Sequence, residues 1–206
     1  MKYREILISQ LKSLPYFSKE TVVLLSKQYD LKPATVDSYI SRSLARKDFI
    51  AFKNGLYVTA DFYYQNAGDI SYTFYLANIM CPPSYVSSWS ALQYYELATE
   101  AIGTVTSVTA KITRIHNNRA GSFSYQFIKK NLFSDFTLIR GKFDFFIATP
   151  AKALFDLIYF KTHAFRGIRD IAAVDGMIDS LRIDIAEMET KERDAFYTKV
   201  KKYLSI

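Results

Sequence analysis

The sequence predicts an α+β protein in which a helical part precedes a part that combines a sheet with further helices. Apolar residues recur at helical spacing through residues 3–47, and β-branched or aromatic residues alternate with polar ones through residues 104–148. Helical spacing returns after Thr149. The 206 residues, half of them apolar, suit one large domain or two small ones and argue against a disordered chain.

Three helices are expected before the first strand, and they cover residues 3–14, 19–29 and 33–47. Pro15 interrupts the first helix. Ser18 is a suitable N-cap for the second, because its hydroxyl can accept a hydrogen bond from a free backbone N–H. Pro33 fits the first turn of the third helix, where its missing N–H removes no needed hydrogen bond.

A β-hairpin is expected next, in the stretch FIAFKNGLYVTA. Asn54-Gly55 is a frequent pair in type I′ turns, in which both residues take a positive φ. Side chains of strand-forming residues alternate on both sides of this pair. Three helices followed by a hairpin predict a winged helix-turn-helix domain at residues 1–60.

In such a domain the third helix enters the major groove of DNA. Its polar face offers hydroxyls and guanidinium groups, with Asp37 as the only carboxylate at its flank. Arginine can pair bidentately with guanine, and a helix N-terminus favours an anion such as phosphate. The predicted DNA contacts are Lys32, Thr35, Ser38, Arg42 and Arg46 on the helix, and Lys53 and Asn54 at the hairpin turn. A winged helix that binds protein is the alternative.

Charge is unevenly distributed along the chain. Residues 1–60 carry +5, residues 61–110 carry −4, residues 111–142 carry +6, and the remainder is neutral, which gives the net charge of +7. Two separated basic blocks favour an anionic partner, of which nucleic acid is the commonest. Ordinary solubility is the alternative for charge alone.

The second basic block holds seven cations, with only Asp135 to offset them: Lys111, Arg114, Arg119, Lys129, Lys130, Arg140 and Lys142. On alternating strands several of these would share one face of the sheet. Such a face could bind phosphate, dock an acidic partner, or simply be solvated.

Residues 61–69, rich in Tyr, Gln, Asn and Gly, are expected to link the winged helix to an α+β domain at 70–206. Helices are predicted at residues 71–80 and 88–97, separated by Pro82-Pro83, then a mainly antiparallel sheet at 104–148. Thr149 is expected to cap a helix that begins at Pro150, and further helices follow at 168–180 and 192–203. The uncharged stretch from Ile70 to Tyr95 is interpreted as core rather than as a membrane span, because it contains prolines, Asn78 and serines.

The chain offers few candidates for catalysis, and no metal or other cofactor is expected. His116, His163 and Cys81 lack ligand spacing, and no Gly-rich phosphate loop is present. Ser87, Ser88 and Ser90 are better explained as a helix start, with one serine capping, than as nucleophiles. A nuclease-like set of Asp135, Asp144 and Asp156 with Lys142 or Lys152 matches no metal-nuclease spacing. The single cysteine and the charged N-terminal stretch predict a cytoplasmic protein without a signal peptide.

Two motifs carry a resemblance to a known family. The first is YLANIMCPPSYVSSWSALQYYEL, with Pro83 to Ser87 and Ser90 to Leu92 as its most specific parts, and the second is FDFFIATPAKALFDLIYF. Together with the N-terminal winged helix, they make the chain similar to the AbiEi antitoxins of bacterial abortive-infection systems. One departure is Ala151, where relatives usually carry a glutamate that would favour the helix dipole.

The resemblance implies a DNA-binding autorepressor that binds inverted repeats in its own promoter through the winged helix. It also implies a type IV antitoxin for phage defence, which counters a nucleotidyltransferase toxin without forming a stable complex, and which is not an enzyme. For the antitoxin activity, only the second basic block can be named. A free-standing regulator without a toxin, or a DNA-directed enzyme such as a nuclease, are the alternatives.

Overall fold

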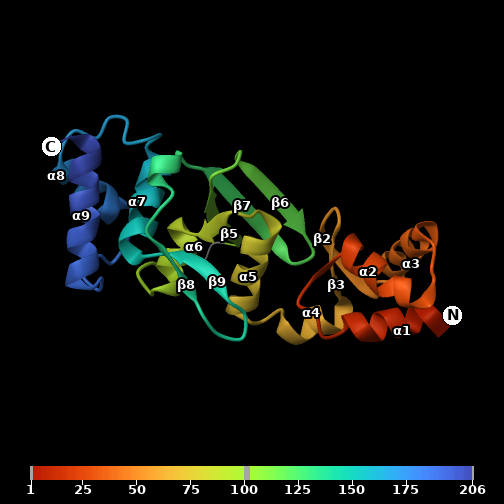
Figure 1. The fold of residues 1–206 in the computed structure, drawn as a ribbon. Coiled ribbons are helices and arrows are strands. Elements are labelled where there is room, and N and C mark those ends of the chain that lie inside the picture. Colours follow the sequence, from red (N-terminus) through yellow and green to blue (C-terminus); the bar gives the residue numbers. More distant parts are fainter. Residues whose placement is uncertain (1, 100–102, 206) are drawn as a thin grey trace. The chain divides into compact units, whose positions relative to one another are not determined.

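The computed structural model describes residues 2–99 and 103–205, and it confirms the α+β class (Figure 1). By its internal contacts the chain divides into two units. The first contains the residues up to Thr73 together with His116–Gly121. The second contains Phe74–Ile115 and the residues from Ser122 onward.

The three predicted N-terminal helices are confirmed, with earlier ends than expected: α1 (Lys2–Leu11), α2 (Lys19–Ser26) and α3 (Pro33–Ala45). Ser18 caps α2, because its side chain accepts a hydrogen bond from the backbone N–H of Thr21. A short 3₁₀ turn, η1 (Lys27–Tyr29), completes the second helix, and Asp30 then takes a φ of 52°. After α3, Lys47 takes a φ of 64°, which ends the helix two residues before the predicted boundary.

A three-stranded antiparallel sheet completes this part, with the order β1 (Phe17–Ser18), β3 (Leu56–Thr59), β2 (Phe49–Lys53). The β2–β3 hairpin is confirmed, but the predicted type I′ turn is wrong. Of the two turn residues only Gly55 has a positive φ, at 78°, and the strand register shifts between Ala51 and Lys53. A bulge therefore absorbs one residue of β2, and Asn54 keeps an ordinary backbone conformation.

The core of the first unit lies between the helices and this sheet. Leu11, Val36 and Phe17 have at most 1% of their surface exposed. The rings of Phe17 and Phe49 meet edge to face at a centroid distance of 4.9 Å, which joins β1 to β2. These contacts fix the inner side of α3 and leave its other side to solvent.

The segment predicted as a linker, residues 61–69, is mostly helical. Thr59 caps helix α4 (Ala60–Asn66) by accepting a hydrogen bond from the N–H of Phe62. The Asn66 amide, which is buried, donates to the Phe62 carbonyl at 2.8 Å. Helix α5 (Ile70–Met80) begins four residues later.

The second unit is built on a sheet of six strands in the order β6-β7-β5-β4-β9-β8, of which β6 lies mostly in the segment His116–Gly121 that is assigned to the first unit. Its strands are β4 (Ser84–Val86), β5 (Thr104–Thr109), β6 (Arg114–Asn118), β7 (Gly121–Phe127), β8 (Phe136–Ile139) and β9 (Phe145–Ala148). The sheet is mixed rather than mainly antiparallel, because β5 pairs with β7, and β4 with β9, in parallel. The central strand β4 was not predicted.

Helices cover both faces of this sheet. Tyr125 of β7 donates to the Ala77 carbonyl in α5 at 2.7 Å, whereas Thr106 of β5 bonds to Ser87 and Ser90 on the other face. That face carries α6 (Ser88–Tyr94) and α7 (Pro150–Lys161), which pack together. Thr149 caps α7 and Pro150 starts it, as predicted.

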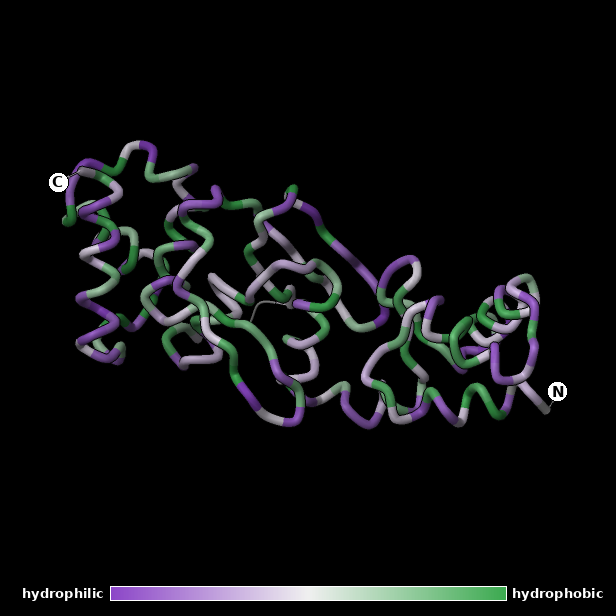
Figure 2. The backbone as a smooth tube through the Cα atoms, in the orientation of Figure 1, coloured by the Kyte–Doolittle hydropathy of each residue, from purple (hydrophilic) through white to green (hydrophobic). Residues whose placement is uncertain are grey.

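The remaining helices are α8 (Ile171–Ser180) and α9 (Thr190–Leu204), and α9 packs against α7. Hydrophilic residues recur along α9 (Figure 2). The buried side of this helix is formed by Phe196 and Val200. Within residues 2–99 and 103–205, no helix has both the length and the hydropathy that a bilayer span requires. The uncharged stretch from Ile70 to Tyr95 is divided among α5, β4 and α6.

Candidate functional site

The outer side of α3 is the surface for which the sequence predicts DNA contacts. Lys32, Ser38, Arg42 and Arg46 are exposed, and Thr35 is partly exposed. Residues four apart lie on one side of a helix, so Ser38 and Arg42 of α3 form a row with Arg46, the C-cap residue of the helix. On the opposite side, Val36 and Ile40 are buried in the core. The helix therefore presents two guanidinium groups to solvent in successive turns.

The one carboxylate at the flank of this row is paired. Lys19 of α2 contacts Asp37 at 2.6 Å, and the hydrogen bond that it donates to the Asp37 carboxylate raises the pKa of Lys19. An exposed pair of this kind contributes little stability. The pair matters for the charge of this surface. Lys19 offsets the negative charge of Asp37, so this carboxylate does not cancel the positive charge that the two arginines present.

Ser38 and the hairpin turn complete the predicted surface. The Ser38 hydroxyl donates to the Ala34 carbonyl at 3.0 Å, so in this rotamer it is available to a ligand only as an acceptor. Asn54 is exposed at the β2–β3 turn, and Lys53 is partly exposed. The predicted site residues of the first unit thus lie on α3 and at the turn, on the solvent side of the structure.

The second basic block does not form the predicted face. Only Arg114 lies within a strand, while the other six residues lie in the connections between strands. Arg119 is in a segment that belongs to the first unit. Arg140 is within 3.9 Å of Asp144, and Asp135 pairs with Lys199, so Asp135 does not offset the block. The expectation that alternating strands gather these cations on one sheet face is wrong.

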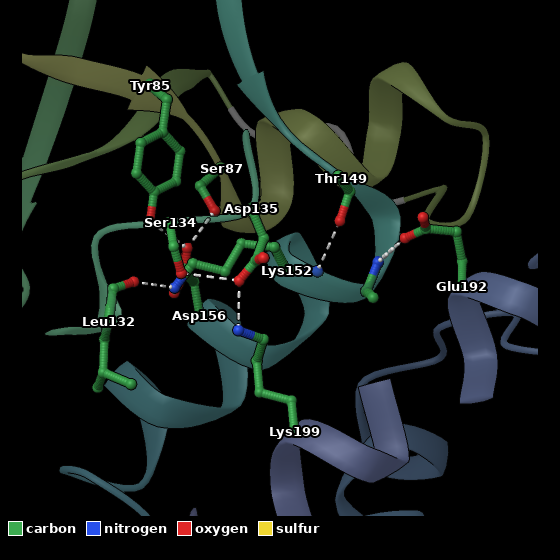
Figure 3. A network of polar contacts seen from close by, with 11 residues as sticks. Tyr85, Ser87, Leu132, Ser134, Asp135, Thr149, Lys152, Asp156, Glu192 and Lys199 are labelled. Carbon is green, nitrogen blue, oxygen red and sulfur yellow. Dashed lines mark hydrogen bonds and ion pairs between the residues drawn. The ribbon is translucent and has the colours of Figure 1, made fainter. Parts of the chain in front are cut away.

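Helix α7 of the second unit carries a buried ion pair (Figure 3). Lys152 and Asp156 lie one turn apart in α7, and neither side chain has exposed surface. Lys152 Nζ contacts Asp156 Oδ1 at 2.6 Å and donates to the Leu132 carbonyl at 2.7 Å. Asp156 Oδ2 accepts hydrogen bonds from Tyr85 at 3.0 Å and from Ser87 at 2.8 Å.

Burial lowers the pKa of Lys152 and raises the pKa of Asp156. The charge of Asp156 counteracts the first shift, and the charge of Lys152 counteracts the second. Burial and the Asp156 charge also raise the pKa of Tyr85, which keeps its hydroxyl protonated as a donor. Three donors thus serve one carboxylate, which favours its ionised form. The cluster ties β4 and the Leu132 segment to α7, and this closed arrangement indicates a structural role.

The serines of the second unit act differently from the prediction. Ser87 occupies the N-cap position of α6, but its side chain is bonded to Asp156 instead of capping the helix. Thr106 of β5 takes that role, since its hydroxyl accepts from the Ser90 N–H at 3.0 Å and donates to the Ser87 carbonyl at 2.6 Å. A side chain from a neighbouring strand replaces the expected serine cap.

A carboxylate from another helix lies at the first turn of α7. Glu192 of α9 accepts a hydrogen bond from the N–H of Ala151 at 3.0 Å (Figure 3). A negative charge at the first turn of α7 is favourable to the helix dipole. Although position 151 is an alanine, Glu192 places an acidic group at the N-terminus of α7.

The nuclease-like set is not brought together as a metal site. Asp156 is paired with Lys152, Asp135 with Lys199, and Asp144 lies beside Arg140. In the described parts of the chain, no three His, Cys, Asp or Glu side chains are placed to hold a metal ion. Cys81 is buried as a free thiol.

No protein-family model matches the chain, and no curated protein matches it.

Sequence reasoning missed Tyr85 and Ser87 as partners of Asp156. The sequence did contain a signal for a buried ion pair. Lys152 and Asp156 are two opposite charges at i, i+4 in a helix whose other residues up to Phe160 are apolar. An apolar surround requires such charges to be paired. Their partners on β4, about seventy residues earlier, cannot be found from spacing.

Tyr85→Phe is expected to lower the free energy of unfolding by about 1.5–3 kcal/mol, because it removes a hydrogen bond to a charged group. Tyr125→Phe is the matched control, since it removes the neutral bond to the Ala77 carbonyl and should cost about 0.5–1.5 kcal/mol. Urea denaturation measures both. An equal or smaller effect for Tyr85→Phe would contradict an ionised Asp156.

Proposed function

We propose that the protein is a DNA-binding transcriptional autorepressor that also acts as an antitoxin against a nucleotidyltransferase toxin. The first unit is the DNA-binding part, and it binds inverted repeats in the promoter of its own operon. The protein performs no catalytic step in this proposal. The observation that carries it is the row of exposed cations on α3, whose flanking carboxylate is paired with Lys19.

The order of elements supports a winged helix. Three helices precede a hairpin, and the short strand β1 pairs with β3 to make a three-stranded sheet. In that arrangement α3 is the recognition helix and the β2–β3 turn is the wing. The wing then offers Lys53 and Asn54 to the phosphate backbone or the minor groove.

The antitoxin half is supported by the resemblance of the second unit to the AbiEi family. The two motifs that carry this resemblance meet in the structure, because Tyr85 and Ser87 of the first contact Asp156 of the second. Their joint role in one buried cluster explains why both would be required for the same fold. A regulator without a toxin is the alternative, and co-expression with the adjacent gene separates the two.

Binding to a labelled duplex from the upstream region, measured by fluorescence anisotropy over a salt series, tests the proposal. Removing one interaction with a phosphate reduces the slope of log affinity against log salt by about one. Lys53→Ala is therefore expected to weaken binding to every duplex equally and to reduce the slope by about one unit.

Lys12→Ala is the charge-matched control, because Lys12 pairs with Asp61 and is not one of the predicted DNA contacts. It removes the same charge and should leave the slope close to that of the unchanged protein. Equal slopes for Lys53→Ala and the unchanged protein would remove the β2–β3 turn from the DNA interface.

A further inference from the structure

The second unit contains a cavity of about 170 Å³ between the sheet and two helices. Ser88 and Trp89 of α6, Ser124 and Gln126 of β7, and Phe160 and Lys161 of α7 line it. These residues come from segments far apart in the sequence, and none of them belongs to the Asp156 cluster or to the predicted DNA contacts. The cavity is therefore a separate feature of this unit.

Its walls combine aromatic surface with a cation. Trp89, the only tryptophan of the chain, lies beside Lys161, whose Nζ is 5.8 Å from the indole ring centroid. Lys161 is exposed and Phe160 is partly exposed. An indole face is a favourable surface for stacking a planar heterocycle, and an exposed ammonium at the same place attracts an anion.

Three polar side chains at the cavity are not used within the protein, whereas Thr106 of β5, which also lines it, is bonded to Ser87 and Ser90. Over residues 2–99 and 103–205, no hydrogen bond or ion pair involves the side chains of Ser88, Ser124 and Gln126. Ser88 is only 8% exposed, and its hydroxyl keeps contact with solvent at the cavity, since it is not one of the fully buried groups without a partner. A hydroxyl that has no protein partner at a cavity wall is available as a donor or acceptor to a ligand.

Ser88 also has a strained backbone. Its φ is 52°, in the left-handed region that residues other than glycine rarely adopt. It directly follows Ser87, which is held by Asp156, and it begins α6. Strain of this kind persists where the surrounding structure imposes it, and it is concentrated at binding sites. The buried cluster thus holds Ser88 at the cavity wall.

We propose that this cavity binds the base of a free nucleoside monophosphate. The volume of about 170 Å³ is close to that of a cavity of about 150 Å³ that holds benzene, so one planar ring system fits. The base stacks on Trp89, and Ser88, Ser124 and Gln126 hydrogen-bond to its edge. Lys161, at the mouth, pairs with the phosphate outside. The proposal is independent of DNA binding by the first unit.

Trp89 makes the test direct, because tryptophan fluorescence in this chain reports on the cavity alone. The full chain is titrated to about 1 mM with AMP, GMP, CMP and UMP, with the matching nucleosides, and with inorganic phosphate. We expect a saturable change for at least one nucleotide, and binding of its nucleoside that is about tenfold weaker or more.

Two variants and one control assign the response to these residues. Lys161→Gln should reduce nucleotide affinity to that of the nucleoside, and Gln126→Ala should alter the preference among the four bases. Both residues are exposed, so both variants are expected to fold, which circular dichroism checks. Lys202→Gln removes the same charge from an exposed site on α9 and should change nothing.

Three results would overturn the proposal. The first is no saturable change with any nucleotide. The second is an equal change with inorganic phosphate, which would mean a simple anion site at Lys161. The third is tighter binding of a short single-stranded oligonucleotide than of any monophosphate. In that case the ligand would be the end of a nucleic-acid strand and not a free nucleotide.

Discussion

Lys152→Met is expected to lower the free energy of unfolding by about 3–5 kcal/mol. The substitution keeps most of the side-chain volume but leaves Asp156 without its cation, in a position with no exposed surface. Tyr85 and Ser87 continue to donate to Asp156, and they cannot replace a full charge. The Leu132 carbonyl is also left without its donor. Urea denaturation followed by circular dichroism measures the change in stability.

The double variant Lys152→Met/Asp156→Leu distinguishes a broken pair from poor packing. Replacing a buried ion pair by apolar residues of similar volume is often neutral or stabilising. We therefore expect the double variant to recover most of the stability that the single substitution Lys152→Met removes. If Lys152→Met lowered the free energy of unfolding by less than about 1 kcal/mol, Asp156 would be neutral in the folded protein, which would contradict the ion pair.

Arg42→Ala is expected to weaken binding to the operator by about 1–3 kcal/mol and to relax its sequence preference at one position. Arg42 lies at the middle of the row formed with Ser38 and Arg46, and it is exposed. A guanidinium there can pair with a guanine through two parallel hydrogen bonds. Competition between the operator and duplexes with single base changes measures both effects.

Arg42→Lys is the matched variant, because it keeps the charge and removes the planar fork. If Arg42 pairs with a base, Arg42→Lys should reduce sequence preference nearly as much as Arg42→Ala does. If Arg42 contacts only phosphate, Arg42→Lys should restore affinity. Unchanged affinity and preference in Arg42→Ala would mean that the recognition face lies elsewhere on the unit.

Most of the helices, and the caps at Ser18 and Thr149, were predictable because their signals are local. Ser18 and Thr149 each satisfy a backbone N–H within three residues of themselves, so the sequence alone contains both partners. Pro33 and Pro150 mark helix starts in the same way. The α+β class follows from hydrophobic periodicity that extends over many residues. An error at the boundary of one helix or strand does not change the predicted class.

Features that depend on distant pairing were missed or wrong. β4 spans three residues directly after Pro82-Pro83, too few to show alternation, and it becomes a central strand only through β5 and β9. The turn at Asn54-Gly55 depends on a register shift in β2 that the dipeptide does not encode. The second basic block was assigned to strands although most of it lies in connections. Tyr85 was unrecognisable because its partner, Asp156, is in another motif.

The side of α3 that carries the predicted DNA contacts depends mainly on local information, which is why its exposure to solvent could be predicted. Helical spacing puts Arg42 and Arg46 opposite Val36 and Ile40, and the structure has those two apolar residues buried. The pairing of Asp37 with Lys19 was not predictable, since it depends on how α2 meets α3. The cavity beside Trp89 was not predictable either, because four chain segments form it.

We propose above that the first unit recognises the promoter of its own operon. A gel-shift titration of the protein against its own upstream region, beside a scrambled duplex at near-physiological salt, measures this recognition. We expect affinity for its own region that is about 10³-fold higher or more, as specific regulators show. Equal, salt-sensitive binding to both duplexes, or binding to neither, would contradict it.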